Sequence, residues 1–152
     1  MYKMKRVNYL LIAVFVMGMT SCLEYGLKEL PAFEDANITD FFFEHRYQVT
    51  SNGNTVTNFI RLTNASRTIG DGTVTIRVTL PNTSGTFTAA EREKVSLNNI
   101  IGYCYISTAA EIEPIDGAPK LGALGNFTSP VKYKVTAADG KTTKIWTITV
   151  TM

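Results

Sequence analysis

Apolar and polar residues alternate most clearly near the end of the chain. One alternating run covers residues 131–136, a second covers residues 145–151, and Asp139-Gly140 lies between them. Two alternating runs around an Asp-Gly turn are typical of an antiparallel hairpin. Because side chains alternate across a strand, the hairpin offers one apolar face to a core and one threonine-lined face to water. Trp146, the only tryptophan, falls on the apolar face.

Five earlier segments carry similar strand patterns and are separated by turn residues such as Asn52-Gly53. They cover residues 38–49, 56–62, 73–80, 100–107 and 110–114. One helix-like stretch begins at Thr88, which together with Glu91 has the spacing of a capping box. We expect a loop over residues 118–126. Seven short strands separated by turn signals predict an all-β fold, an antiparallel β-sandwich with one short helical turn.

The first predicted strand contains three consecutive aromatic residues. Phe41 and Phe43 share one face of the strand, whereas Phe42 points to the other face. Three aromatic residues in a row can form a stacking platform for sugars, but large aromatic side chains more often form a core, and we interpret Phe41 and Phe43 as core residues. Exposed aromatic residues grouped on one sheet face, such as Phe42, Tyr103 and Tyr105, would favour a binding role.

The first residues have the features of an export signal rather than of a folded domain. Lys3, Lys5 and Arg6 precede an apolar run over residues 9–17, which is too short to span a membrane as a helix. The next residues, Met19-Thr20-Ser21-Cys22, resemble a bacterial lipobox, in which the cysteine becomes the lipidated first residue of the mature protein.

The lipobox resemblance implies the organisation of the chain and its location. We expect a lipoprotein signal peptide over residues 1–21, a lipid-anchored tether over residues 22–36 and one domain over residues 37–152. No aspartate follows Cys22, which favours the outer membrane, and Glu24 weakly resembles an export signal of surface lipoproteins in Bacteroidetes. One acyl chain binds a membrane only reversibly, whereas the two or three chains of a lipoprotein hold the protein there.

Removal of the signal changes the charge balance. Cleavage before Cys22 removes 21 of the 152 residues and leaves 131, the size of one domain with a real core. Three of the 15 basic residues leave with the signal, so 12 remain against 13 acids and the mature net charge is −1. No basic excess remains for nucleic acid, and we expect no nucleic-acid partner.

Several stretches resemble a known family. The resemblance lies in residues 38–41, 106–114, 125–131, 133–140 and 146–150. These stretches are similar to the Ig-like domain of uncharacterised outer-membrane lipoproteins of Bacteroidetes. The resemblance implies an Ig-like β-sandwich and a domain of unknown function, with no catalytic or binding residues to carry over. Related modules often precede a glycan-binding or hydrolase domain, and no such domain follows in this sequence, which speaks against a polysaccharide role.

Candidate catalytic side chains are few. Nothing in the sequence pairs Cys104 with His45, the only histidine, and we expect Cys104 to be buried and chemically quiet. Glu111 and Glu113 share one face of a short strand. A glycosidase needs two such acids, but acids on the outward face of a strand are usually just solvated.

Signals for metals and phosphates are also weak. Three Asp-Gly pairs, which begin at Asp71, Asp116 and Asp139, lack the further oxygen donors of a calcium loop, and we interpret them as turns. A phosphate-binding loop follows a strand and opens a helix. Gly122 and Gly125 do not lie between a strand and a helix. We therefore expect no metal, no cofactor and no catalytic residue, and the ligand-binding residues stay unassigned.

The sequence as a whole predicts a lipid-anchored lipoprotein of the bacterial cell envelope with one Ig-like β-sandwich domain. We expect a non-enzymatic binding or accessory module on the outer membrane. Its partners would be the membrane, through Cys22, and an envelope protein or glycan. The alternative is a glycan-active hydrolase or a glycan-binding component of a nutrient-uptake system. A cleft with two acids at catalytic distance would favour the hydrolase.

Overall fold

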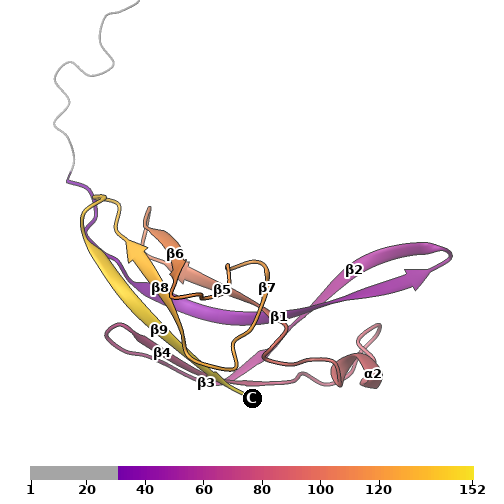
Figure 1. The fold of residues 1–152 in the computed structure, drawn as a ribbon. Helices are drawn as coiled ribbons and strands as arrows, with labels where there is room; N and C mark the ends of the chain where they lie inside the picture. The colour runs from indigo at the N-terminus through magenta and orange to yellow at the C-terminus, as the bar shows by residue number, and fades with distance from the viewer. Residues whose placement is uncertain (1–30) are drawn as a thin grey trace, which may run out of the picture. The chain divides into compact units, whose positions relative to one another are not determined.

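Residues 31–152, which the computed structural model describes, form two β-sheets that share one hydrophobic core (Figure 1). The first sheet has the order β2-β1-β5-β7, formed by β1 (Ile38–Ser51), β2 (Asn54–Arg61), β5 (Ile100–Ile106) and β7 (Leu124–Gly125). The second has the order β3-β4-β9-β8-β6, formed by β3 (Thr63–Ile69), β4 (Thr73–Thr79), β6 (Glu111–Ile115), β8 (Val131–Thr136) and β9 (Thr143–Thr151). One short helix, α2 (Ala89–Arg92), lies between β4 and β5 in the chain. The predicted all-β sandwich is confirmed.

All seven predicted strands are present, and β3 and β7 are additional. The sequence of β3 is mostly polar and lacks an alternating pattern, so it carries no strand signal. β7 has only two residues and lies inside the segment that we expected to be a loop. One pairing also departs from the antiparallel prediction, because β4 and β9 run parallel. These two strands are distant in the chain, and only the tertiary fold makes them neighbours.

The longest hairpin joins β1 to β2. Its two turn residues, Asn52 and Gly53, have φ angles of 51° and 77°, which is the left-handed conformation that a two-residue type I′ turn requires. β1 pairs with β5 from Ile38 to Glu44 and with β2 from Glu44 to Ser51. The hairpin therefore extends beyond the end of β5 (Figure 1).

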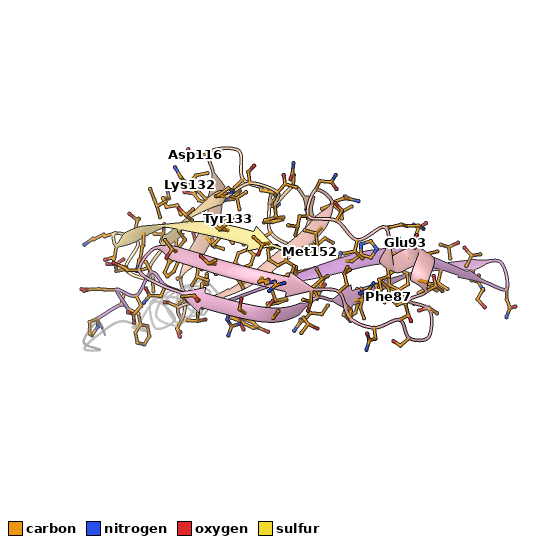
Figure 2. All side chains as sticks on the ribbon, turned by 90° about the horizontal axis from the view of Figure 1, so that it is seen from below. Phe87, Glu93, Asp116, Lys132, Tyr133 and Met152 are labelled. Atoms are coloured by element: carbon orange, nitrogen blue, oxygen red, sulfur yellow. The ribbon has the colours of Figure 1, made fainter. Side chains whose placement is uncertain are left out.

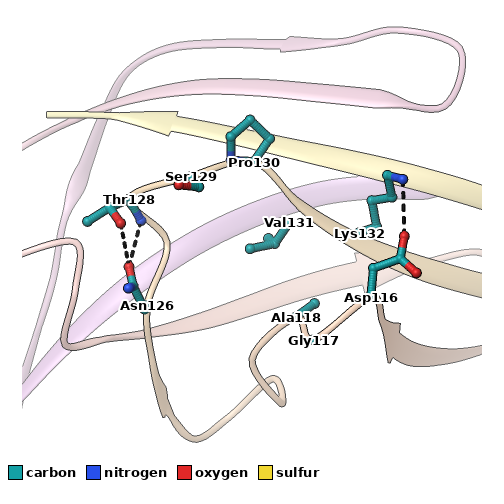
Figure 3. A pocket seen from close by; sticks show the side chains of 9 residues that line it. All are labelled: Asp116, Gly117, Ala118, Asn126, Thr128, Ser129, Pro130, Val131 and Lys132. Carbon is teal, nitrogen blue, oxygen red and sulfur yellow. Dashed lines mark hydrogen bonds and ion pairs between the residues drawn. The ribbon is translucent and has the colours of Figure 1, made fainter.

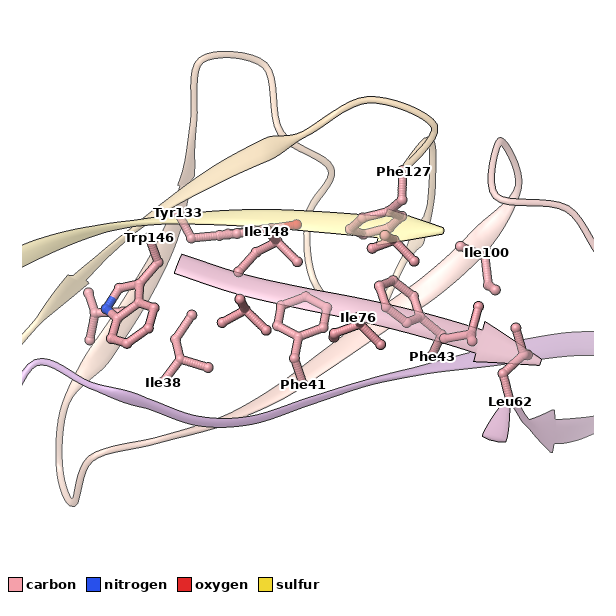
Figure 4. Packing of buried hydrophobic residues seen from close by; sticks show 14 of the residues in the cluster. Ile38, Phe41, Phe43, Leu62, Ile76, Ile100, Phe127, Tyr133, Trp146 and Ile148 are labelled. Carbon is pink, nitrogen blue, oxygen red and sulfur yellow. The ribbon is translucent and has the colours of Figure 1, made fainter. Parts of the chain in front are cut away.

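The core between the sheets is rich in aromatic side chains (Figure 4). Phe41 and Phe43 of β1 are completely buried, with ring centroids 5.3 Å apart. Tyr133 lies across from them, and its ring centroid is 6.2 Å from that of Phe41. Trp146 is also buried and donates its Nε1–H to the Ala36 carbonyl at 2.9 Å. The assignment of Phe41, Phe43 and Trp146 to the core is confirmed.

The terminal hairpin keeps the predicted alternation. Trp146, Ile148 and Val150 are buried, whereas Thr147 and Thr149 lie on the opposite face and are half-buried. β8 and β9 pair in register from Val131 with Ile148 to Thr136 with Thr143. The period of two therefore correctly separated the core face from the outward face.

The segment that contains α2 lies beside the β1–β2 hairpin. The Oγ1 of Thr88 accepts the Glu91 N–H at 3.2 Å, so the predicted N-cap is confirmed. The Glu91 carboxylate does not complete the capping box and instead contacts His45 Nε2 at 3.3 Å and Lys94 Nζ at 2.9 Å. Figure 2 shows Glu93, next to this contact, at the hairpin end of the domain.

The predicted signal peptide (1–21) and Cys22 lie outside the described residues. Among residues 31–152, no helix is long and apolar enough to cross a membrane. The last part of the expected tether contacts the domain, because the Phe33 carbonyl accepts the Asp139 N–H at 3.2 Å. All core residues belong to the unit Ala32–Met152, which therefore has the core that independent folding needs.

Candidate binding face

The two outer faces of the sandwich differ in chemistry. Threonine dominates the outer face of the second sheet, where Thr75 lies opposite Thr149 and Thr73 lies opposite Thr147. The first sheet instead carries aromatic and arginine side chains on its outer face. Strand parity explains this arrangement, because the residues of β1 that alternate with the buried Phe41 and Phe43 must point outward.

Pairing registers identify the side chains on the outer face of the first sheet. Phe42 of β1 lies opposite Tyr103 of β5, and Arg46 of β1 lies opposite Phe59 of β2. Residues directly opposite each other in a sheet share a face. We call this surface the aromatic face and define it by Phe42, Phe59, Tyr103, Tyr105, Leu124, Arg46 and Arg61.

Phe42 lies at the centre of the aromatic face and is covered from both sides. The Tyr103 ring stacks on it at a centroid distance of 5.4 Å and an interplanar angle of 13°. The Arg61 guanidinium lies 4.1 Å from the Phe42 centroid, and it comes from β2, on the other side of β1 from Tyr103. Tyr105 adds a tilted ring at 5.6 Å. The grouping of Phe42, Tyr103 and Tyr105 that would favour a binding role is therefore present.

Each arginine of the aromatic face contacts a neighbouring side chain of the first sheet. Arg61 Nη2 lies 3.5 Å from Glu44 Oε1, and the Glu44 side chain is only 10% exposed. Arg46 donates from Nη2 to the Tyr103 hydroxyl. Both guanidinium groups therefore have a side-chain partner within the domain.

A groove of about 310 Å³ adjoins the aromatic face. It lies where the β1–β2 hairpin extends past β5, and Arg46, Ile101 and Leu124 are among the residues that line it. Ile101 is buried, whereas Leu124 and the nearby Phe59 are more than half exposed. The groove and the aromatic face together form one continuous candidate surface.

A second cavity, of about 460 Å³, is polar and lies near the start of β8 (Figure 3). Its charged groups already satisfy each other, since Lys132 Nζ lies 3.0 Å from Asp116 Oδ2. Asn126 Oδ1 accepts the Thr128 N–H at 2.9 Å and the Thr128 hydroxyl at 2.7 Å. Internal pairing of this kind is typical of a turn, and it leaves few polar groups directed at a ligand.

Within residues 31–152, no hydrogen bond joins the candidate nucleophile, Cys104, to the histidine. Cys104 faces inward opposite Phe41, is half-buried rather than fully buried, and packs against the core. Burial raises the pKa of the Cys104 thiol to about 11, which disfavours the reactive thiolate. The ring nitrogen of His45 contacts Glu91 at 3.3 Å.

The other candidate residues occupy ordinary structural positions. Glu113 forms an ion pair with Lys134 on the neighbouring strand, and Glu111 lies two residues earlier on the same edge strand. The hydrogen bond from the Thr142 hydroxyl lowers the pKa of the Asp139 carboxylate, and the N–H groups of Lys141 and Thr142, both at 2.9 Å, add to the effect. In residues 31–152, no group of three or more His, Cys, Asp and Glu side chains could hold a metal ion.

Sequence reasoning found three members of the aromatic face and missed four. The sequence predicts Phe42, Tyr103 and Tyr105 as candidates. Arg46 has the same strand parity as Phe42, and this signal could have identified it. Phe59 and Leu124 could be assigned to this face only from the register of β2 and the position of β7. No local sequence pattern shows either of these.

Comparisons with known proteins place the chain among bacterial domains. Residues 38–149 match the model of a family described as DUF5018-related. A crystallised protein of Bacteroides fragilis, inferred to be secreted, is 41% identical, and the match covers 80% of this chain and 98% of that chain with a TM-score of 0.72. A Bacteroides thetaiotaomicron protein, inferred to be a glycoside hydrolase, is 21% identical over 82% of this chain and 27% of that chain, with a TM-score of 0.49. The match to the second protein is too weak to say anything about the activity of the present chain. No curated protein matches it.

Proposed function

We propose that this chain, which belongs to the DUF5018-related family of domains of unknown function, is a non-enzymatic binding module that recognises a protein partner through the aromatic face. The observation that carries the proposal is the difference between the two outer faces of the sandwich. One face is threonine-rich, whereas the other groups aromatic rings with arginines. Aromatic residues and arginine are enriched at protein interfaces and among their energetic hot spots.

Exposure supports the same surface. Phe59, Tyr105 and Leu124 are 62%, 58% and 57% exposed, although each is a large hydrophobic side chain. Single exposed hydrophobic residues are common, but a group of them on one sheet face is typical of an interaction site. The guanidinium groups of Arg46 and Arg61 add hydrogen-bond donors to it.

The geometry of Phe42 favours a protein partner over a glycan. Sugars stack on the free face of an aromatic ring, and the two sides of Phe42 are occupied by Tyr103 and Arg61. A glycan would therefore have to stack on other rings of this face, such as Tyr105 or Phe59. A protein partner can instead pack against ring edges and pair with the guanidinium groups.

Two observations support the proposed location, a similar solved structure and the lipobox resemblance. The similar Bacteroides fragilis protein is inferred to be secreted, which supports an extracellular or envelope location. The finer proposal is an outer-membrane lipoprotein anchored through Cys22, in which the described sandwich is an Ig-like domain. Two packed sheets with connections that cross between them are in keeping with that class.

A site-specific cross-linking experiment tests the binding proposal. The full chain is produced in Bacteroides cells with a photoreactive phenylalanine analogue at Tyr105, and a matched variant carries it at Thr75 on the opposite outer face. We expect illumination to give one discrete adduct with an envelope protein from position 105 and none from position 75. The same products from both positions, or none from either, would contradict a partner site on the aromatic face.

A separate experiment tests the alternative that the domain binds a glycan. Affinity electrophoresis of Ala32–Met152 in gels that contain host or plant polysaccharides would reveal binding as slowed migration. Slowing that Tyr105→Ala abolishes and Thr75→Ala leaves intact would favour a glycan-binding component. Release of reducing sugar by the domain would show that it is an enzyme.

A further inference from the structure

Three of the four edge strands of the two sheets carry features that discourage pairing with another strand. β3 has a register shift between Asn64 and Ser66 and carries Arg67. β6 contains Pro114 directly after the exposed Glu113, and β7 has only two residues. Bulges, charges, proline and shortness are the usual means by which proteins protect their sheet edges.

The fourth edge strand, β2, has none of these features over most of its length. It pairs with β1 without a register shift over eight residues. Its sequence from Asn54 to Ile60 holds no proline and no charge, and Arg61 is its only charged residue. A regular, neutral edge of this length is a template for a further strand.

The ladder between β1 and β2 shows which backbone groups of β2 are free. Leu62 donates its N–H to the Phe43 carbonyl at 3.0 Å, in continuation of the same register. Hydrogen-bonded pairs alternate along an antiparallel ladder, so the even-numbered residues of β2 bond to β1. The odd-numbered residues direct their N–H and C=O groups to the open edge. Within residues 31–152, no backbone hydrogen bond reaches those groups.

Two side chains along this edge are also unusually exposed. Val56 is 57% and Phe59 is 62% exposed. Val56 lies on the inner side of the hairpin, opposite Val49, and Phe59 lies on the outer side, opposite Arg46. A strand added beside β2 would cover both side chains at once.

We propose that two copies of this chain pair through their β2 edges as antiparallel strands, with the two-fold axis at Asn58. This register brings the free odd-numbered residues into hydrogen-bonded pairs, with Thr57 opposite Phe59 of the second copy. It places Val56 opposite Ile60 on one face and brings the two Phe59 rings into diagonal contact on the other. Arg61 lies opposite Thr55, so no like charges face each other.

The pairing joins the four-stranded sheets of two copies into one continuous sheet. Each two-fold interface uses the same patch on both subunits, so the assembly closes as a dimer and does not grow. The aromatic faces of the two copies become neighbours on one side. The dimer would therefore present two copies of the proposed binding surface to a partner.

Sedimentation of Ala32–Met152 over a range of concentrations tests the dimer. We expect reversible dimerisation of the wild type. Thr57→Pro removes an edge-facing N–H without touching the ladder to β1, and should weaken the dimer about tenfold or more. The matched control Thr57→Ala keeps the N–H and should change the dissociation constant by less than about threefold.

A charge pair tests the register independently of any effect of proline on folding. Thr55→Glu would face Arg61 of the second copy and should tighten the dimer about threefold, whereas Thr55→Arg should weaken it by a similar factor. A domain that stays monomeric at every concentration overturns the proposal, as does a folded Thr57→Pro variant that dimerises like the wild type. If Thr57→Pro fails to fold, equal effects of the two Thr55 variants overturn it.

Discussion

Trp146 connects parts of the chain that are far apart in sequence. Its ring is buried between the sheets, and its indole N–H is bonded to Ala36, just before β1 begins. We expect Trp146→Ala to lose about 3–5 kcal/mol, against a total free energy of unfolding of about 5–15 kcal/mol. Thr147→Ala, on the other face, should cost about 1 kcal/mol or less.

Urea unfolding of the two variants in Ala32–Met152 measures this contrast. Because Thr147 is adjacent to Trp146, the comparison tests the one-sided burial of β9 and not only the importance of a tryptophan. Equal losses in the two variants would mean that both faces of β9 are buried.

Cys104 offers a second test at the scale of one residue. Burial raises its pKa to about 11, so the thiolate is scarce at neutral pH. We expect a thiol reagent to label the native domain slowly, with a rate that rises with pH, and to label it quickly once urea unfolds it. Ala32–Met152 contains no other cysteine, so the signal is unambiguous. Rapid labelling of the folded domain at neutral pH would reopen a nucleophilic or redox role.

At the scale of elements, Glu91 attaches α2 to β1. The hydrogen bond from Lys94, aided by the bond with His45, lowers the Glu91 pKa below its ordinary 4.5, although burial opposes the shift. A lowered carboxyl pKa contributes stability that is present above the unfolded value and is lost as the pH falls through the folded value. The free energy of unfolding should therefore fall as the solution is acidified below pH 4.5.

Variants of α2 isolate that contribution. We expect Glu91→Gln to flatten the acid side of the stability profile, as measured by urea unfolding at a series of pH values. Glu93→Gln, which alters an exposed acid two residues away, should keep the slope of the wild type. An unchanged slope in Glu91→Gln would show that the contact with His45 and Lys94 does not stabilise the fold.

At the scale of the whole molecule, the lipobox resemblance gives a direct prediction. Cys22→Ala in the full chain should abolish incorporation of a labelled fatty acid and release the protein from membranes. Cys104→Ala removes the other cysteine and should leave both properties unchanged. Label that persists on Cys22→Ala would contradict lipidation at this residue.

The two outer faces of the sandwich carry different kinds of side chain. One outer face is rich in threonine and also carries charged side chains such as Lys134 and Glu113. The other is the aromatic face with its adjoining groove. A partner bound to the aromatic face would lie beside the β2 edge, because Phe59 belongs to both surfaces. Pairing of two copies and recognition of a partner are therefore expected to influence each other.

The sequence by itself determined seven of the nine strands in residues 31–152 and, where apolar and polar residues alternate, the side of the strand that is buried. Phe41, Phe43 and Trp146 could be assigned to the core, and Phe42 and Thr147 to outer faces, because a strand reverses its side chains at every residue. The Asp-Gly and Asn-Gly turns could also be read locally, since they depend on the φ of one or two residues. These features depend on neighbours in the chain and need no knowledge of the fold.

Apart from the terminal hairpin, only the tertiary structure decided which strands are neighbours. The parallel pairing of β4 with β9, the stack of Tyr103 on Phe42 and the approach of Arg61 from β2 join residues that are distant in sequence. Such pairings depend on how both sheets close over one core. A one-residue change of register would move every side chain of a strand to the opposite face. The aromatic face therefore depends on the register between strands. This register cannot be deduced from the alternation within a single strand.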